Sequence, residues 1–261
     1  MPEGTFKRPR PPIIFSEAEY LKLYRDAPAH ALGVDGSTSY LWSPTAAERI
    51  SELVGNQAKI IIILRDPVER AYSNYLGDYR DGVESRTFRD AIGEELVHPK
   101  RMWGSQSVYL SSSLYFESVL RFRNAFGADN VKIFFYEEMV SNTIDLKNEL
   151  SAFLGIDAQL WSDEPLPHEN NFGVPRSKFS RWLLSQGHLR QVSRLVVPDT
   201  LRNRIRLSLI LFDRTKRMPL EKDMDAQLID YFRNDVIDLS TIATPPWLKK
   251  YASCDEMKHN I

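Results

Sequence analysis

The sequence contains a single cysteine, Cys254, among 261 residues, so no disulfide can form within the chain. A lone cysteine fits a reducing compartment and gives no sign of a catalytic thiol. The five histidines are scattered, and no spacing typical of a metal site occurs. We therefore expect neither a disulfide-stabilised scaffold nor a metal centre.

Long apolar runs are also absent, so no segment reaches the length of a membrane span. The amino end has basic residues but lacks the apolar core of a secretion signal. The formal net charge of -1 gives no indication of a general affinity for polyanions. We expect a cytoplasmic, soluble protein without a membrane or nucleic-acid partner, and the sequence leaves its oligomeric state open.

Neither of the glycine-rich motifs that hold nucleotide phosphates, GxxxxGK[ST] and GxGxxG, occurs, and the 12 glycines are dispersed. A nucleotide would have to be held without such a loop, or by a loop in a part of the protein outside this chain. The hydrophobic content of 43% is nevertheless sufficient for a sizeable core, so the chain is expected to fold as a globular domain.

The stretch from Lys59 to Leu76, KIIIILRDPVERAYSNYL, organises the rest of the chain. Its apolar, β-branched run at 60–64 predicts a short strand covered on both faces. Asp66 as N-cap, Pro67 as first helical residue and Glu69 in the reciprocal capping position predict a helix directly afterwards.

Arg65 lies at the corner between this strand and this helix. In open α/β sheets, ligands bind at such turns, at the carboxyl ends of the strands, so Arg65 is the first candidate binding residue. The alternative is an arginine that pairs with Asp66 or a neighbouring carboxylate and completes the turn.

Apolar periodicity and cap residues predict the remaining elements. Helices are expected at 16–24, 43–54, 87–97, 107–126, 141–154, 176–186, 188–196, 199–212 and 221–239, and further strands at 31–34 and 131–136. Helices that alternate with strands indicate an α/β fold with a parallel sheet flanked by helices, followed by a helical C-terminal portion. We expect an extended arm at 1–15, one domain at 16–250 and a tail at 251–261, because two prolines at 245–246 end the ordered pattern.

Two further segments suggest function. Residues 162–176 form a long loop dense in proline, asparagine and glycine, and such loops are often functional. The segment 176–217 holds eleven lysine or arginine residues against two aspartates. It suits an anion-binding surface, although the solvated faces of two or three helices are a commoner origin of such a run.

The motif LRDPVERAYSNYL, preceded by GVDGSTSYL and followed by a strand ending in FYEE, resembles the bacterial sulfotransferases that use 3'-phosphoadenosine 5'-phosphosulfate (PAPS), which are related to heparan sulfate sulfotransferases. The resemblance covers about residues 16–248 and is specific at 64–76. It implies a P-loop-like fold and transfer of a sulfuryl group from PAPS, as co-substrate and without a metal, to a hydroxyl or amine. A carbohydrate or a small metabolite is the acceptor that it implies.

In that family the arginine that begins the RDP motif and the serine eight residues later hold the 3'-phosphate, which implies that Arg65 and Ser73 bind the cofactor. Ser73 lies about 10 Å along the helix axis from Asp66, at roughly 1.5 Å per residue. Because helical side chains lean toward the amino end and arginine is long, a phosphate can be bound between them. The alternative for Ser73 is a surface serine without a partner.

The resemblance also implies two further site residues. The loop GVDGSTSYL often carries a glutamate that acts as general base, and the matching residue is Asp35, whose side chain is one methylene shorter. An Asx turn at Asp35 and Gly36 is the alternative. Arg176 matches a loop that lies near the cofactor in the family.

The amino end departs from the family, which begins with a strand and a lysine-containing loop that grips the 5'-phosphosulfate. Nothing before Ser16 matches that loop, and Lys7, Arg8 and Arg10 lie among prolines. We therefore expect the first strand-loop-helix unit to be missing from this chain. Two alternatives stay open: a non-catalytic protein that retains the 3'-phosphate site, and an anion-surface binding protein that uses the basic segment 176–217.

Overall fold

The computed structural model describes residues 16–28, 31–81, 83–97, 108–161, 173–175, 177, 180, 201, 205, 210–212 and 219–252. Several sequence predictions fall outside these residues: the arm at 1–15, the helix at 188–196, Arg176 and most of the basic segment around it.

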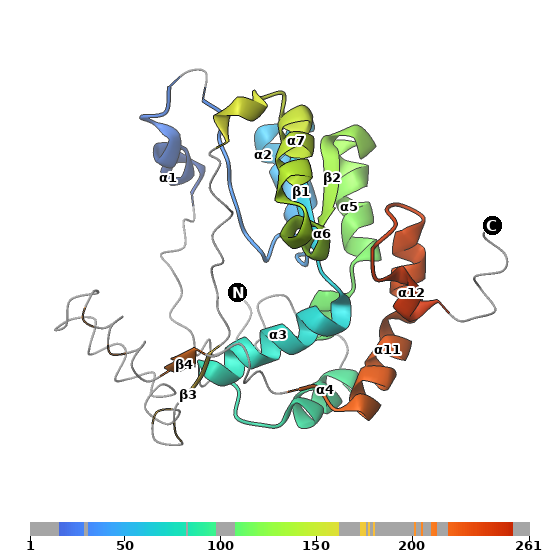
Figure 1. Ribbon diagram of the computed structural model, residues 1–261. Helices are drawn as coiled ribbons and strands as arrows, with labels where there is room; N and C mark the ends of the chain where they lie inside the picture. The colour runs from blue at the N-terminus through green and yellow to red at the C-terminus, as the bar shows by residue number, and fades with distance from the viewer. Residues whose placement is uncertain are drawn as a thin grey trace.

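Two strands, β1 (Ile60–Leu64) and β2 (Val131–Phe135), pair in parallel over their full length, with Ile60 opposite Val131. The predicted parallel sheet is thus confirmed. Helix α5 (Phe116–Phe126) packs against both strands, as Figure 1 shows. Because the strands run in the same direction, the residues that follow them, Arg65 and Tyr136, emerge at the same edge of the sheet.

Burial along β1 alternates, with Ile62 and Leu64 buried while Ile61 and Ile63 are 40% and 53% exposed. The expectation of a strand covered on both faces is therefore wrong within the described residues. A continuous apolar run does not distinguish a strand buried on both faces from one buried on a single face, because only packing decides it.

The other helices and strands confirm an α/β fold with a helical C-terminal portion (Figure 1). They are α1 (Glu17–Leu21), α2 (Ala46–Val54), α3 (Pro67–Arg80), α4 (Phe88–Val97), α6 (Tyr136–Ser141), α7 (Thr143–Leu154), α11 (Lys222–Ser240), α12 (Leu248–Tyr251) and the antiparallel pair β3 (Gly173–Pro175) and β4 (Ile210–Phe212). Short 3₁₀ turns are η1 (Lys22–Tyr24), η2 (Ser111–Ser113), η3 (Ala128–Asn130) and η4 (Ala158–Leu160). None of the described helices is both long and apolar enough to span a bilayer.

Several predicted boundaries are wrong. Residues 31–34 form no strand, and α2 begins at Ala46 instead of Ser43. The helix predicted from 107 begins only at Phe116, because the serine hydroxyls of η2 bond to backbone carbonyls and Leu114 is extended. The predicted helix at 199–212 ends in β4. The predicted ends are more accurate, since Gly55 and Gly127, with φ of +80°, follow α2 and α5.

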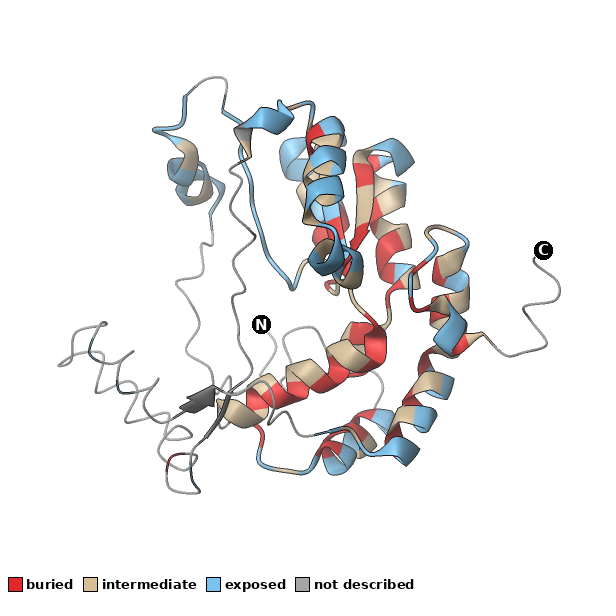
Figure 2. Cartoon of the chain, in the orientation of Figure 1, coloured by how far each residue is buried: buried red, intermediate tan, exposed pale blue. Residues whose placement is uncertain are grey.

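Helix α3 forms the centre of the core. Its apolar stripe is buried at Val68, Ala71, Tyr72, Tyr75 and Leu76, while Tyr79 is half-buried. Figure 2 shows this buried face along α3, and α11 packs against α3 and α5. Helix α11 likewise has a buried apolar face, formed by Leu228, Phe232, Val236 and Leu239.

The prolines at 245–246 do not end the ordered chain. Helix α12 follows them and packs on α11, and its last residue, Tyr251, is completely buried. The prediction treated the two prolines as a stop, whereas they precede the first turn of a short helix, a position that tolerates proline.

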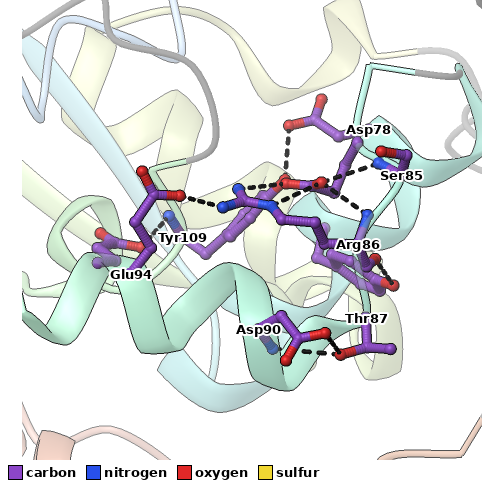
Figure 3. A network of polar contacts seen from close by, with 10 residues as sticks. Asp78, Ser85, Arg86, Thr87, Asp90, Glu94 and Tyr109 are labelled. Atoms are coloured by element: carbon purple, nitrogen blue, oxygen red, sulfur yellow. Dashed lines mark hydrogen bonds and ion pairs between the residues drawn. The ribbon is translucent and has the colours of Figure 1, made fainter.

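A polar network fixes the loop between α3 and α4 (Figure 3). The buried Glu84 accepts hydrogen bonds from the backbone N–H groups of Ser85 and Arg86 and from the Arg86 guanidinium, at 2.8–3.1 Å. Arg86 also pairs with Glu94 of α4. Burial alone would raise the pKa of Glu84, but these hydrogen bonds and the Arg86 charge lower it to about 2.

Candidate functional site

The turn between β1 and α3 is held by side chains from other elements. The carbonyl oxygen of Arg65 accepts a hydrogen bond from the Tyr115 hydroxyl at 2.9 Å. The next amide, that of Asp66, donates to Glu137 Oε1 at 3.2 Å. Both polar atoms of the peptide unit between Arg65 and Asp66 are therefore bound to side chains, which fixes its orientation.

Asp66 is the N-cap of α3, as predicted. Its Oδ1 accepts from the backbone N–H groups of Val68 and Glu69 at 2.9 and 3.2 Å. The same carboxylate binds Tyr251 Oη at 2.9 Å and Lys250 Nζ at 3.2 Å, both from α12. The positive end of the α3 dipole is thus occupied by an internal carboxylate, so an anion at this turn must be bound by side chains.

The Arg65 guanidinium pairs with Glu69, with 3.1 Å between Nη2 and Oε2, and lies over the Tyr136 ring at 5.1 Å. Of the two pairings weighed for Arg65, the one with Asp66 is not formed and the one with a neighbouring carboxylate is. The reciprocal capping role predicted for Glu69 is wrong, because Glu137 takes the Asp66 amide. Both side chains of the pair are partly exposed, and such i,i+4 pairs contribute only about 0.3–0.5 kcal/mol.

Ser73 is half-buried, and its hydroxyl has no hydrogen-bond partner in the part of the chain that the structure describes. Glu69 and Ser73 lie four residues apart on one face of α3, outside its buried stripe. Arg65 precedes the helix and joins this row through its ion pair with Glu69. Glu69 is the middle member of this row. A phosphate bound by Arg65 and Ser73 would therefore have to replace the Glu69 carboxylate at the guanidinium.

Arg70 was missed by the sequence reasoning, although its position three residues before Ser73 was a usable signal. Its Nη1 donates to the hydroxyls of Ser112 and Ser113 at 2.8 and 2.9 Å. These hydroxyls in turn donate to the carbonyls of Val108 and Tyr109. No carboxylate within the described residues forms an ion pair with Arg70, and burial lowers the pKa of its guanidinium.

Turn η2, whose serine hydroxyls accept hydrogen bonds from Arg70, is also bound by Glu95 of α4. This carboxylate is almost completely buried and accepts three backbone N–H groups, from Tyr109, Leu110 and Ser111, at 2.8–2.9 Å. A carboxylate with three such donors is well compensated for its burial. Glu95 and Arg70 together fix η2 against α3.

Asp35, the candidate base, forms its hydrogen bonds with residues outside the β1–α3 turn. The hydroxyls of Tyr20 and Tyr40 both donate to its Oδ2, at 2.9 and 3.0 Å. Burial, followed by these hydrogen bonds, raises the pKa of both tyrosines. The Asx turn weighed for Asp35 does not form, and no hydrogen bond or ion pair joins it to Arg65 or Ser73.

Two other features of the described residues bear on the site. No group of three or more histidine, cysteine, aspartate or glutamate side chains is arranged to hold a metal ion there. A depression of about 490 Å³ lies between α2 and α5, where Glu48 and Arg121 are among its lining residues. None of the candidate residues at the β1–α3 turn lines it, so it is separate from that turn.

The residues at the turn fit a phosphate monoester. Arg65 offers paired N–H donors on a partly exposed side chain, and Ser73 offers a hydroxyl without another described partner.

Comparisons with known proteins place this turn inside a recognised domain. Residues 47–172, which include β1, α3 and β2, match the family model of the sulfotransferase domain. The chain is 24% identical over 224 residues to the bifunctional heparan sulfate N-deacetylase/N-sulfotransferase 1 of Xenopus tropicalis, and equally to that of Xenopus laevis. These matches cover 82% of the chain but only 23% of each of those longer proteins.

Among solved structures, the chain resembles the crystal structure of a sulfotransferase from Alicyclobacillus acidocaldarius. The TM-score is 0.65 at 22% sequence identity, and the match covers 91% of this chain and 74% of that one. At this level of identity the likeness concerns the fold.

Proposed function

Because residues 47–172 belong to the sulfotransferase domain family and the chain has the fold of a solved sulfotransferase, we propose that it transfers a sulfuryl group from PAPS to a hydroxyl or amine acceptor. The observation that carries the proposal is the ion pair with Glu69, which brings Arg65, at the carboxyl edge of the parallel sheet, to the face of α3 that also carries Ser73. A carbohydrate acceptor is supported by the relatives, whose names include heparan sulfate N-sulfotransferase.

Arg65 would bind the 3'-phosphate with two N–H groups in place of the Glu69 carboxylate, and Ser73 would donate its hydroxyl. The Asp66 cap would keep the turn in place while Arg65 exchanges partners. When bound, PAPS supplies the sulfuryl group and the nucleotide leaving group. Arg176 is proposed as a further contact to the nucleotide and lies outside the described residues.

Asp35 is proposed as the base that takes the proton from the acceptor. Both of its hydrogen bonds end on Oδ2, which leaves Oδ1 for proton transfer. A base must come within hydrogen-bond reach of the proton it takes, so the acceptor would bind beside the Tyr20 and Tyr40 hydroxyls.

Arg65→Ala is expected to weaken the binding of 3'-phosphoadenosine 5'-phosphate by about 30-fold or more, because charge-assisted hydrogen bonds contribute about 1.5–3 kcal/mol each. Ser73→Ala, which removes a neutral donor, should weaken it by about 5-fold. Isothermal titration calorimetry measures both. Arg49→Ala is the matched control, since it removes another Arg–Glu pair, with Glu52 on α2.

A sulfate-transfer assay with PAPS and a panel of amine- and hydroxyl-bearing glycans separates the enzyme from the non-catalytic alternative. Transfer that is lost in both Arg65→Ala and Asp35→Asn would support the proposal. Nucleotide binding without transfer would favour the binding protein, and equal binding by wild type and Arg65→Ala would remove the 3'-phosphate site altogether.

A further inference from the structure

The peptide unit between Arg65 and Asp66 has an unusual set of partners. In a regular strand or helix its carbonyl and amide would bond to backbone groups, whereas here both bond to side chains, those of Tyr115 and Glu137. The Asp66 carboxylate is bound in addition by Tyr251. These three residues come from the start of α5, from α6 and from α12, so three separate parts of the chain meet at one turn.

Tyr115 is almost completely buried, and burial raises the pKa of its hydroxyl. A phenol that stays protonated is a permanent donor to the Arg65 carbonyl. Asp235 of α11 accepts the backbone N–H of Tyr115 at 2.7 Å, which fixes the residue from its other side.

Glu137 binds the turn through one oxygen only. Its Oε1 accepts the Asp66 amide, while its Oε2 is buried without a hydrogen-bond partner. An unsatisfied buried carboxylate oxygen lowers the free energy of unfolding by about 1–3 kcal/mol, so stability alone does not explain a glutamate at position 137. The preceding residue, Tyr136, places its ring against the Arg65 guanidinium, so the end of β2 contacts both the backbone and the side chain at this position.

Tyr251 reaches the turn from the far end of the described chain. It is completely buried, its hydroxyl lies 2.9 Å from Asp66 Oδ1, and its carbonyl accepts from Arg233 of α11. Figure 1 shows α12 next to the amino end of α3. Its neighbour Lys250 joins Asp66 and Asp225 by ion pairs of 3.2 and 3.5 Å.

We propose that Tyr115, Glu137 and Tyr251 form a clamp that positions Arg65 for a 3'-phosphate monoester. The inference rests on the proposed function and goes beyond it, because none of the three touches the nucleotide. Holding the peptide plane restricts backbone rotation beside Arg65, so less backbone conformational entropy is lost when the residue binds the ligand. The three members are positioning residues.

The test compares two nucleotides that differ in the recognised group, 3'-phosphoadenosine 5'-phosphate and adenosine 5'-monophosphate. The ratio of their dissociation constants reports the contribution of the 3'-phosphate alone. Tyr115→Phe and Tyr251→Phe each remove one hydroxyl without changing the ring. Tyr75→Phe is the matched control, since the buried Tyr75 also donates to a backbone carbonyl, that of Arg86 at 3.0 Å, and lies on α3 itself.

Both clamp variants are expected to lower the preference for the 3'-phosphorylated nucleotide by about 3- to 10-fold and to leave affinity for adenosine 5'-monophosphate unchanged. Tyr75→Phe should keep the wild-type preference even if it lowers the melting temperature as much as the clamp variants do. In an Arg65→Ala background, neither clamp variant should lower the preference further, because the group it positions is gone.

A preference retained in both variants, or an equal loss for both nucleotides, would overturn the clamp while the 3'-phosphate site stands. The same holds if Tyr75→Phe reproduces the effect. A wild-type protein without any preference for the 3'-phosphate would remove the proposed site and the clamp together, so the two failures are distinguishable.

Discussion

Arg65 pairs with Glu69 and not with the adjacent Asp66, because the Asp66 carboxylate already holds two helix N–H groups, Lys250 and Tyr251. Glu69, one turn further along the helix, therefore faces the guanidinium. In the proposed site Glu69 occupies the position at Arg65 that a phosphate would take, and it competes with the ligand.

Glu69→Gln is therefore expected to tighten the binding of 3'-phosphoadenosine 5'-phosphate by about 2- to 5-fold, because exchange at a partly exposed ion pair is worth only a fraction of a kcal/mol to about 1 kcal/mol. Calorimetry at low ionic strength measures the change, and Glu52→Gln, which removes the partner of Arg49, is the control. Weaker binding in Glu69→Gln would mean that Glu69 contributes to the site instead of competing for it.

The candidate residues that the sequence identified are those whose positions depend on a few neighbours in the chain. Arg65 follows from the strand-to-helix turn, and the motif resemblance adds Ser73. Glu137, Tyr251 and Lys250 lie 71 or more residues from Asp66 along the chain, so no local pattern connects them with the turn. Their role depends on tertiary packing, which neither periodicity nor cap residues describe.

At the scale of elements, the ends of helices were easier to predict than their starts. Gly127 and Gly155 end α5 and α7 because glycine takes the positive φ that other residues avoid. The start of α5 depends on Asp235, which accepts the first N–H groups of the helix from another element. Because the capping carboxylate comes from α11, the sequence around residue 115 contains no signal for the start of α5.

The loop between α3 and α4 provides a test at this scale. Glu84→Gln keeps an oxygen for the backbone donors but removes the charge that faces Arg86, so it should lower the free energy of unfolding by about 2 kcal/mol at pH 7. The pKa of Glu84 is lowered in the folded state, so its charge stabilises the fold above the unfolded pKa. That contribution is lost as the pH falls from about 4.5 towards 2.

Urea unfolding of wild type and variant between pH 7 and pH 3 measures this effect. The difference between them should shrink on acidification. Glu94→Gln removes the exposed second partner of Arg86 and should change the free energy of unfolding by less than about 0.5 kcal/mol. A pH-independent difference would show that Glu84 acts through packing and not through its charge.

At the scale of the whole molecule, the C-terminal helices α11 and α12 are joined to the amino ends of α5 and α3. Asp235 caps α5, and Lys250 and Tyr251 bind the cap residue of α3. The amino ends of α5 and α3 are thus both bonded to residues of the C-terminal helices. We expect these parts to unfold in one cooperative transition.

Asp235→Ala is predicted to lower the free energy of unfolding by about 1–2 kcal/mol through loss of the α5 cap. Burial raises the pKa of Asp235 in spite of its two backbone donors, and the charges of Asp238 and Glu117 add to the rise. A raised carboxyl pKa stabilises the fold most below the unfolded value near 3.9, and part of this is lost as the pH rises through the folded value.

The difference between wild type and Asp235→Ala should therefore grow as the pH falls from 7 to 4, opposite to the behaviour of Glu84→Gln. Urea titrations at several pH values measure it, with Asn234→Ala, at an exposed residue of the same helix that does not titrate, as the control. Two separate unfolding transitions in Asp235→Ala would argue against the cooperative unit.

The parallel pairing of β1 with β2 also has a kinetic consequence. Ile60 meets Val131 only after all of residues 65–130 have been drawn into a closed loop, whereas the hydrogen bonds within α3, α4 and α5 join near neighbours in the chain. Closing a long loop costs conformational entropy before any strand contact repays it, so sheets of this kind form slowly. Since Glu137 follows β2 and binds the Asp66 amide, we expect the turn to acquire its final geometry only after the two strands have paired.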